Sequence, residues 1–277
     1  MPRHYWVILL AGIVACSDKS VLRYRPRRDG VHHYVLTMRY AREDVRIMSA
    51  VPHHNQVWTV YYTQFGRFTD LRGAGSEVSL QIDSVQLQSD QPAPDLSVMK
   101  GRTISAFLDG RGQLLRTEPA RGAFSNLTPD MVFRLHAMAA ATAPSFPQEP
   151  VEPGDRWTMI TRSLLEEFSI GPPPDGLAEL PLGATLNAIH ESVNDKVAEV
   201  GIHGSLPTRE TRVNTSLGSL PARSSGNVVG QYRFSLPRGV MLSQELSGRL
   251  MLVTDAPMLG RDTLLSKLVS QTTIRLQ

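Results

Sequence analysis

The sequence has little cysteine, few aromatic residues and no excess of either charge. Its 277 residues include one cysteine, 6% aromatic residues, and 29 Lys and Arg against 26 Asp and Glu. A single cysteine cannot form a disulfide within the chain. Nearly balanced charge gives no electrostatic case for nucleic-acid binding. A hydrophobic content of 41% is ordinary for a folded chain and excludes wholesale disorder.

Long apolar runs are also missing. The most apolar stretch, Tyr5–Val14, has ten residues, whereas a helix that crosses a bilayer needs about 20. No second run approaches that length. The sequence therefore predicts no membrane-spanning helix, and the short run after Arg3 has the pattern of a secretory signal.

The motifs of common enzymes are absent or incomplete. The chain has no G-x-S-x-G and no P-loop. Ser97 and Lys100 match S-x-x-K, but no S-D-N or K-T-G companion follows. His190-Glu191 begins H-E-x-x-H, but Asn194 stands where the second histidine belongs. Glu166-Glu167 shows no pairing that would shift a pKa. We predict no catalytic residue, and hence that the protein is not an enzyme.

Two histidine pairs, His32-His33 and His53-His54, are the best candidates for metal ligands. If the strands that follow them form a hairpin, the pairs lie roughly 20 Å apart. We interpret them as histidines at loop edges and predict no metal site and no cofactor.

The end of the apolar run resembles the lipobox of bacterial lipoproteins. Its residues are Ile13-Val14-Ala15-Cys16: a branched apolar residue, a tolerated position, a small residue and the cysteine. The resemblance implies that 1–15 is a signal peptide and that Cys16 is the lipid attachment site, carrying acyl chains such as palmitate. Two or more acyl chains anchor a protein stably. Ser17 after the cysteine favours, in that family, the outer membrane facing the periplasm.

A basic segment follows the predicted anchor within residues 16–28. Its basic residues are Lys19, Arg23, Arg25, Arg27 and Arg28. Attraction to anionic headgroups is one interpretation, worth about 1 kcal/mol per basic residue near a charged surface. A solvated strand edge is the other, because Leu22 and Tyr24 alternate with arginines. The two interpretations are compatible.

Alternation with period two dominates the rest of the chain and predicts strands. Clear examples are 33–40, 56–63, 78–87 with a bulge at Asp83-Ser84, 185–193 and 196–203. Asp109–Gly112 predicts a hairpin turn. The polar stretch 205–225 is expected to be a long mobile loop. From 240 to 252, Val240, Leu242, Leu246, Leu250 and Leu252 are expected on one face, interrupted by Gln244 and Gly248.

One helix is predicted over 128–142. Thr128 is a suitable N-cap, Pro129 occupies the first helical position, and Asp130 favours the positive end of the helix dipole. Met131, Leu135 and Met138 form an apolar stripe. Pro144 ends the helix, and the Pro-rich stretch 146–157 is expected to join two halves.

A weak internal repeat suggests that the halves are related. Residues 107–115 and 234–242 each read as strand, Arg-Gly turn and strand, which a duplication would produce. Chance similarity of two hairpins is the alternative. We expect a first β-rich half with the helix at 29–143 and a second β-rich half at 144–277.

The expected fold is mainly β: long antiparallel strands in a curved sheet or open barrel, with the helix packed on it. Such a sheet can enclose an apolar groove. We therefore predict a lipid-anchored, non-enzymatic protein of the bacterial envelope that binds a hydrophobic ligand or acyl chain. The alternative is a structural or protein-interaction lipoprotein without a ligand. Some short segments also resemble uncharacterised secreted bacterial lipoproteins, at 22–26 and 150–157; they imply no activity.

Overall fold

The computed structural model describes residues 19–24, 30–44, 54–67, 75–90, 95–119, 127, 131–132, 135–136, 138–139, 145–161, 180–215, 218–255 and 263–277. The strands are β1 (Val31–Asp44), β2 (His54–Arg67), β3 (Gly75–Ser89), β4 (Thr103–Asp109), β5 (Leu114–Pro119), β6 (Arg156–Thr161), β7 (Leu180–Glu191), β8 (Lys196–Thr215), β9 (Gly218–Ser235), β10 (Val240–Asp255) and β11 (Thr263–Leu276). One short 3-10 helix, η1 (Ser97–Met99), lies between β3 and β4.

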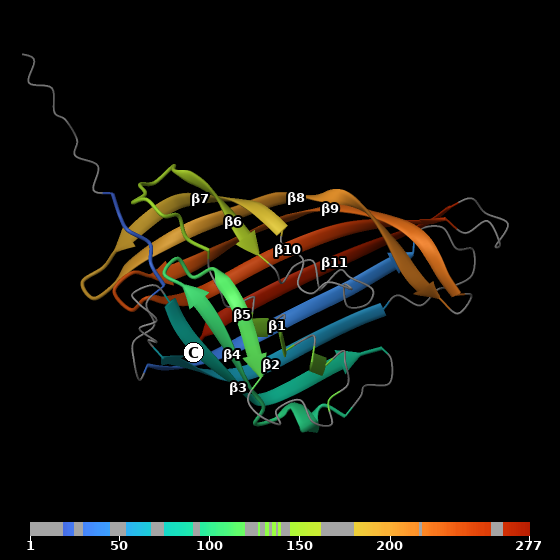
Figure 1. Ribbon diagram of the computed structural model, residues 1–277, viewed down its shortest axis with the longest axis horizontal. Coiled ribbons are helices and arrows are strands. Elements are labelled where there is room, and N and C mark those ends of the chain that lie inside the picture. Colours follow the sequence, from blue (N-terminus) through green and yellow to red (C-terminus); the bar gives the residue numbers. More distant parts are fainter. Residues whose placement is uncertain are drawn as a thin grey trace, which may run out of the picture.

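All the strands belong to one open antiparallel sheet. Its order is β5-β4-β3-β2-β1-β11-β10-β9-β8-β7-β6. The chain runs outward from the centre along β1 to β5, passes to the opposite edge, and returns inward from β6 to β11, which pairs with β1. The long strands bend together into a curved band (Figure 1). The mainly β prediction is confirmed.

The strand order places the two segments of the predicted repeat at corresponding positions in the sheet. Reading across the sheet, β5 to β1 and β10 to β6 appear in the same relative order, with β11 between them. The Arg-Gly turn of each half joins the fourth and fifth strands of its run, β4 to β5 and β9 to β10. The two similar sequences therefore occupy equivalent places. Duplication, and the division at 143–144, stay predictions.

Apolar side chains alternate into one face of the sheet, as period two requires. On β3 the residues Val78, Leu80 and Ile82 are at most 1% exposed, while their neighbours are partly exposed. The register shifts where Tyr61 pairs with Ser84 and Tyr62 with Ile82. The bulge predicted at Asp83-Ser84 is therefore confirmed.

The predicted central helix is not supported as an element, because the described part of the chain contains no bounded α-helix. Six of its residues are described and have helical backbone: 131, 132, 135, 136, 138 and 139. Of these, Met131, Leu135 and Met138 are buried. The ends of the predicted helix lie outside the described residues.

The loop predicted at 205–225 is wrong. The described residues of this stretch extend β8 and β9, which stay paired up to Thr215 and Gly218. Polar composition indicates contact with water, but paired strands satisfy their own backbone groups whatever their side chains. Leu206, Leu220 and Ala222 are buried.

The expected apolar row on β10 is wrong at Leu242. A register shift between Met241 and Ser243 moves Leu242 out of the row, and Met241 is buried instead. A bulge changes which alternate residues face inward, and a period-two pattern read without it places the start of the strand on the wrong face.

Candidate functional site

The inner, concave face of the sheet is the largest apolar surface that the strands create. Each strand contributes alternate side chains to it, among them Leu36 of β1, Val60 of β2, Leu186 of β7 and Val228 of β9. These four side chains are at most 3% exposed. We call this surface the concave face, and it is the candidate functional site.

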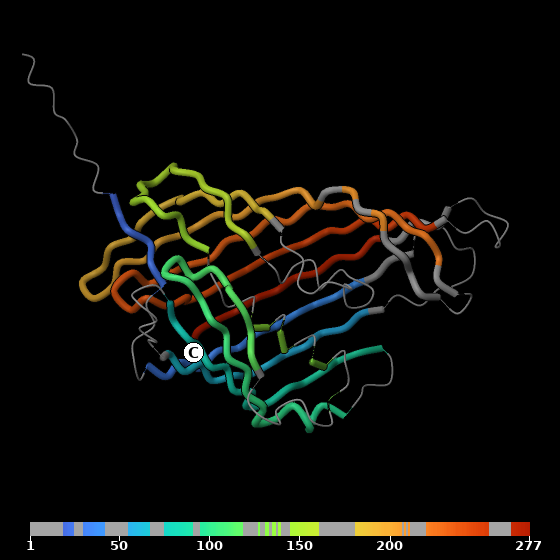
Figure 2. The backbone as a smooth tube through the Cα atoms, in the orientation of Figure 1, coloured from blue at the N-terminus to red at the C-terminus, as the bar shows by residue number. Residues whose placement is uncertain are grey.

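A short stretch between β5 and β6 connects the two edges of the open sheet. We call residues 145–151 the strap. The Phe146 amide donates to the Arg111 carbonyl in the β4–β5 turn, at 2.8 Å. At the other edge, the Trp157 Nε1 of β6 donates to the Ser145 carbonyl, at 3.0 Å. The strap therefore ties together edges that do not pair with each other (Figure 2).

The N-terminal segment 19–24 packs beside the strap. Ser20 and Val151 exchange two backbone hydrogen bonds, both 2.8 Å long. Leu22 and Tyr24 are buried, whereas Val21 is 48% exposed. The alternation predicted from the sequence is confirmed here, because apolar residues point inward and Arg23 is exposed.

Six aromatic side chains gather at one end of the concave face, which we call the aromatic end. They are Tyr24, Tyr34, Tyr62, Phe146, Tyr232 and Phe234, each at most 2% exposed. Phe146 meets Phe234 edge to face at 4.6 Å, and Tyr34 stacks on Tyr62 at 5.3 Å between ring centroids. Such pairs add about 0.5–1.5 kcal/mol beyond burial.

Polar atoms at the aromatic end divide into two groups. The Tyr34 hydroxyl donates to the Met241 carbonyl at 2.9 Å, and Gln64 Nε2 donates to the Tyr24 hydroxyl at 2.6 Å. The Tyr62 and Tyr232 hydroxyls and His32 Nε2 are buried with no hydrogen-bond partner among the residues that the structure describes. Unpaired buried groups of this kind cost stability unless something satisfies them.

Burial shifts the pKa of these groups toward their neutral forms. Desolvation raises the pKa of the Tyr62 and Tyr232 hydroxyls well above their usual value, so both keep their protons. Desolvation, with a smaller effect from the Arg238 charge, lowers the pKa of His32. All three groups can therefore offer a hydrogen bond at neutral pH.

The other part of the concave face is lined by small residues on the central strands, and we call it the glycine end. Its members are Gly226 and Gly230 of β9, Gly248 of β10, and Ser270 and Thr272 of β11. Gly248 pairs with Ser270, whereas Gly226 and Gly230 pair with Leu250 and Leu246, so the small residues alternate with large apolar ones across the strands. Ser270 and Thr272 are nonetheless at most 2% exposed.

Two of these glycines are required by the backbone. A Cβ on Gly226 would overlap the Arg249 carbonyl oxygen, and a Cβ on Gly230 would overlap the Glu245 carbonyl oxygen. Backbone atoms cannot move aside as a flexible side chain can. Glycine therefore lets the backbone of β10 approach β9 here more closely than a residue with a Cβ would allow.

Several methionines belong to the core. Six of the ten methionines are buried in the core, namely Met38, Met99, Met131, Met138, Met159 and Met241. Methionine is unbranched and polarisable, and it adapts to irregular or changing partners. The concave face is therefore suited to repacking around an apolar guest.

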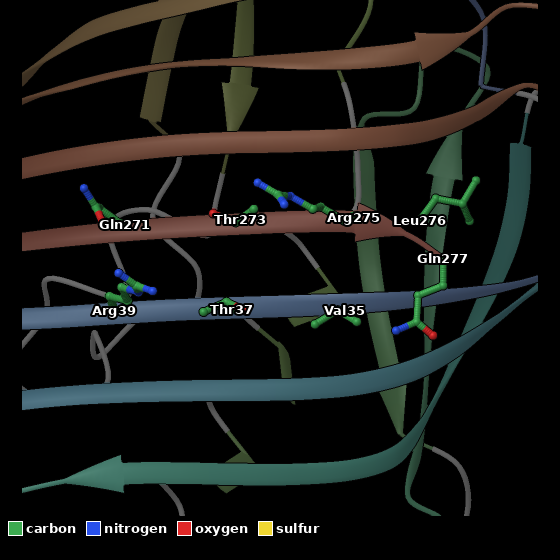
Figure 3. A pocket seen from close by; sticks show the side chains of 8 residues that line it. All are labelled: Val35, Thr37, Arg39, Gln271, Thr273, Arg275, Leu276 and Gln277. Atoms are coloured by element: carbon green, nitrogen blue, oxygen red, sulfur yellow. The ribbon is translucent and has the colours of Figure 1, made fainter.

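Two grooves lie on the opposite, outer face. The first, about 620 Å³, is bordered by β1 and β11, with Arg39, Gln271, Thr273 and Arg275 along it (Figure 3). The second, about 470 Å³, runs over β9, β10 and β11 beside Gln231. Both mix polar and apolar residues and neither contains a methionine, so neither is a methionine-lined cavity for an acyl chain.

The structure separates the residues that the sequence singled out. Cys16, His53 and Glu166-Glu167 lie outside the described residues. His32 pairs with Gln64, whereas Arg42 pairs with His54, so the two histidine pairs lie at opposite ends of the β1–β2 hairpin. This confirms that they are far apart.

The residues of the two incomplete motifs, S-x-x-K and H-E-x-x-H, make contacts that belong to the fold. Ser97 begins η1, where its amide donates to Asp95 Oδ1 at 2.9 Å. His190 lies on β7 with Nε2 3.6 Å from Glu199 on β8, and both side chains are partly exposed. No group of three or more His, Cys, Asp or Glu residues suited to a metal occurs among the residues described.

Sequence analysis missed the unpaired tyrosines and His32 as possible ligand contacts. Tyr34 and Tyr62 lie in the alternating stretches 33–40 and 56–63. No local sequence pattern shows whether a buried hydroxyl has a hydrogen-bond partner. That depends on strands far apart in the sequence, such as β1 and β10 for Tyr34 and Met241.

No helix within the described ranges is long and apolar enough to cross a membrane. No protein-family model matches the sequence, and no curated protein matches it. One solved structure, of lipovitellin and concerned with lipid–protein interactions, is similar to this chain with a TM-score of 0.52 at 7% identity. The similarity covers 92% of this chain but only 25% of that one. At this identity, the comparison shows that the two share a fold.

Proposed function

We propose that this protein is a lipid-anchored, non-enzymatic protein of the bacterial envelope that holds a hydrophobic ligand against the concave face of its sheet. The observation that carries the proposal is the single open sheet with a continuous apolar inner face. Its edges β5 and β6 are joined by the strap and not by strand pairing. In such a sheet the distance between the two edges can change to admit or enclose a ligand, without breaking the hydrogen bonds between neighbouring strands.

The lining supports an apolar, flexible ligand. Buried methionines can repack around an acyl chain. The shared fold with lipovitellin, a protein studied for its lipid–protein interactions, agrees with this class of ligand.

The anchor completes the proposal. Cys16 would carry acyl chains at the mature N-terminus, and Ser17 would direct the protein to the outer membrane, facing the periplasm. The segment 19–24 follows within a few residues and packs on the strap, so the anchor would hold the concave face close to the bilayer. Cys16→Ser should abolish labelling by an acyl-chain analogue, and equal labelling of wild type and variant would refute the anchor.

The second candidate is a structural or interaction protein with a permanently filled core. The complete burial of the aromatic end favours it. Mass analysis of organic extracts from the purified full chain separates the two. A ligand carrier should release a stoichiometric apolar compound that is absent from an extract of an unrelated lipoprotein prepared in parallel. A scaffold should release only the bulk lipids common to both extracts.

A further inference from the structure

His32 and Tyr62 place two unpaired polar atoms on either side of Tyr34. The rings of Tyr34 and Tyr62 are nearly parallel at 12° and 5.3 Å, and the His32 ring meets Tyr34 edge-on at 6.5 Å. β1 and β2 are neighbours, and His32 pairs with Gln64 while Tyr34 pairs with Tyr62. Both atoms therefore belong to one patch of the concave face.

The other polar groups around this patch are satisfied by the protein itself. Tyr34 donates to the Met241 carbonyl, and Gln64 donates to Tyr24. Only the Tyr62 hydroxyl and His32 Nε2 are left without partners in this patch of the described structure. Native proteins seldom leave buried polar atoms unpaired, so each such atom calls for a partner that the described residues do not supply.

We propose that this patch receives the polar head of the bound acyl chain, with a carbonyl or carboxylate oxygen accepting hydrogen bonds from the Tyr62 hydroxyl and the His32 imidazole. The inference rests on the proposed function, because it assumes that an apolar chain lies along the concave face. It adds the direction of that chain: the head lies at the aromatic end and the tail extends toward the glycine end.

The electrostatics of the patch favour an acceptor over a cation. Burial keeps the Tyr62 hydroxyl protonated and favours the neutral form of His32, so both can donate. The positive charge of Arg238, in the β9–β10 turn, acts on both His32 and Tyr34. A head that bears negative charge gains from that field, whereas an amine would be repelled.

The test compares Tyr62→Phe with Tyr34→Phe on the full chain, using three fluorescent probes: cis-parinaric acid, its methyl ester, and diphenylhexatriene, which has no oxygen. Tyr62→Phe should weaken binding of the acid and the ester about tenfold, roughly the worth of one hydrogen bond, and leave diphenylhexatriene binding unchanged. Tyr34→Phe removes a hydrogen bond within the protein, so it should affect all three probes alike.

The outcomes keep this inference apart from the proposed function. Equal affinity of wild type and Tyr62→Phe for the acid would overturn the inference while leaving the ligand-binding proposal standing, because the hydroxyl would then be satisfied by water or by nothing. Failure of wild type to bind any probe would overturn both. Arg238→Gln distinguishes the two kinds of head: weaker binding of the acid alone identifies a free carboxylate, and no change for either probe identifies an ester.

The unliganded variants give an independent readout. Tyr62→Phe should melt at the same temperature as wild type or higher, because it removes a polar group with no partner. Tyr34→Phe should melt lower, because it removes a buried hydrogen bond within the protein. A drop for Tyr62→Phe as large as that for Tyr34→Phe would show that the Tyr62 hydroxyl already has a structural partner, and the inference would be lost.

Discussion

The two ends of the concave face solve the problem of filling one curved sheet in opposite ways. The aromatic end uses large rings, brought together from the N-terminal segment, three strands and the strap. The glycine end uses residues with little or no side chain on three adjacent central strands. The contrast teaches that burial alone does not describe a site. Both ends are buried, but the aromatic end is built from rings, whereas the glycine end alternates small residues with Val228, Leu246 and Leu250.

The strap and the N-terminal segment explain why the rings gather where they do. Both are fixed by backbone hydrogen bonds at the aromatic end, through Ser20, Val151 and Phe146. An open sheet leaves its edge strands unpaired, which natural proteins avoid by covering or connecting the edges. The aromatic end is therefore the anchored end of the fold, and any change of shape is expected at the glycine end.

Removing the ring of the strap should produce the largest effect. Phe146→Ala deletes a side chain that is 1% exposed and packed on Phe234 and Tyr232. We expect the free energy of unfolding to fall by about 4 kcal/mol, measured by urea denaturation. Leu115→Ala is the control, because Leu115 is 56% exposed and should change stability by less than about 0.5 kcal/mol. Similar small effects from both would show that the strap does not hold the aromatic end.

At Gly230, the neighbouring backbone of β10 should not tolerate even one added carbon. In Gly230→Ala the new Cβ meets the Glu245 carbonyl oxygen, so we expect a loss of about 2–3 kcal/mol. Gly201→Ala is matched to it, because its Cβ would meet only the flexible Asn187 side chain at 3.0 Å. Thermal melts that rank the two variants in the reverse order would contradict the close approach of β9 and β10.

A single hydrogen bond distinguishes the tyrosines of the aromatic end. Tyr34→Phe loses the bond to the Met241 carbonyl, which links β1 to β10 across β11. We expect a loss of about 1–2 kcal/mol, since a buried hydrogen bond is removed. Urea denaturation measures it, and a stability equal to that of wild type would mean that the two strands are not held by this bond.

The smallest stability change, and the most direct bearing on function, is expected for Gly248→Leu. If the glycine end borders a ligand, the new side chain should weaken fatty-acid binding while stability changes by less than about 1 kcal/mol. A filled core would instead lose about 1–3 kcal/mol from overpacking. Parallel melts and binding titrations of the variant decide between the two, and lost stability with unaltered binding would remove the glycine end from the site.

Much of the fold was predictable from the sequence because strand periodicity is local. The alternation within 33–40 predicted the strand that became β1, and the pattern within 78–87 predicted the bulge at Asp83-Ser84. The polar composition of 205–225 led to the wrong prediction of a loop, because a stretch rich in Ser and Thr has the same composition in paired strands as in a loop. The bulge at Leu242 was missed because it shows only in the register with β9.

The candidate site was predictable only in kind. An apolar inner face follows from alternation and curvature. Which polar atoms within it lack partners depends on contacts between segments distant in the chain, such as Tyr24 with Gln64 and Tyr34 with Met241. The strap was recognisable as a connector from its prolines, but its contacts with both sheet edges depend on where β5 and β6 end.

The central claim is that the concave face holds an acyl chain, and a binding titration of the full wild-type chain tests it most directly. Fluorescence of cis-parinaric acid should rise saturably to about one probe per chain, and unlabelled oleic acid should displace it. A linear rise with no saturation, or a signal that oleic acid does not displace, would contradict the claim and leave a scaffold with a filled core as the account of this fold.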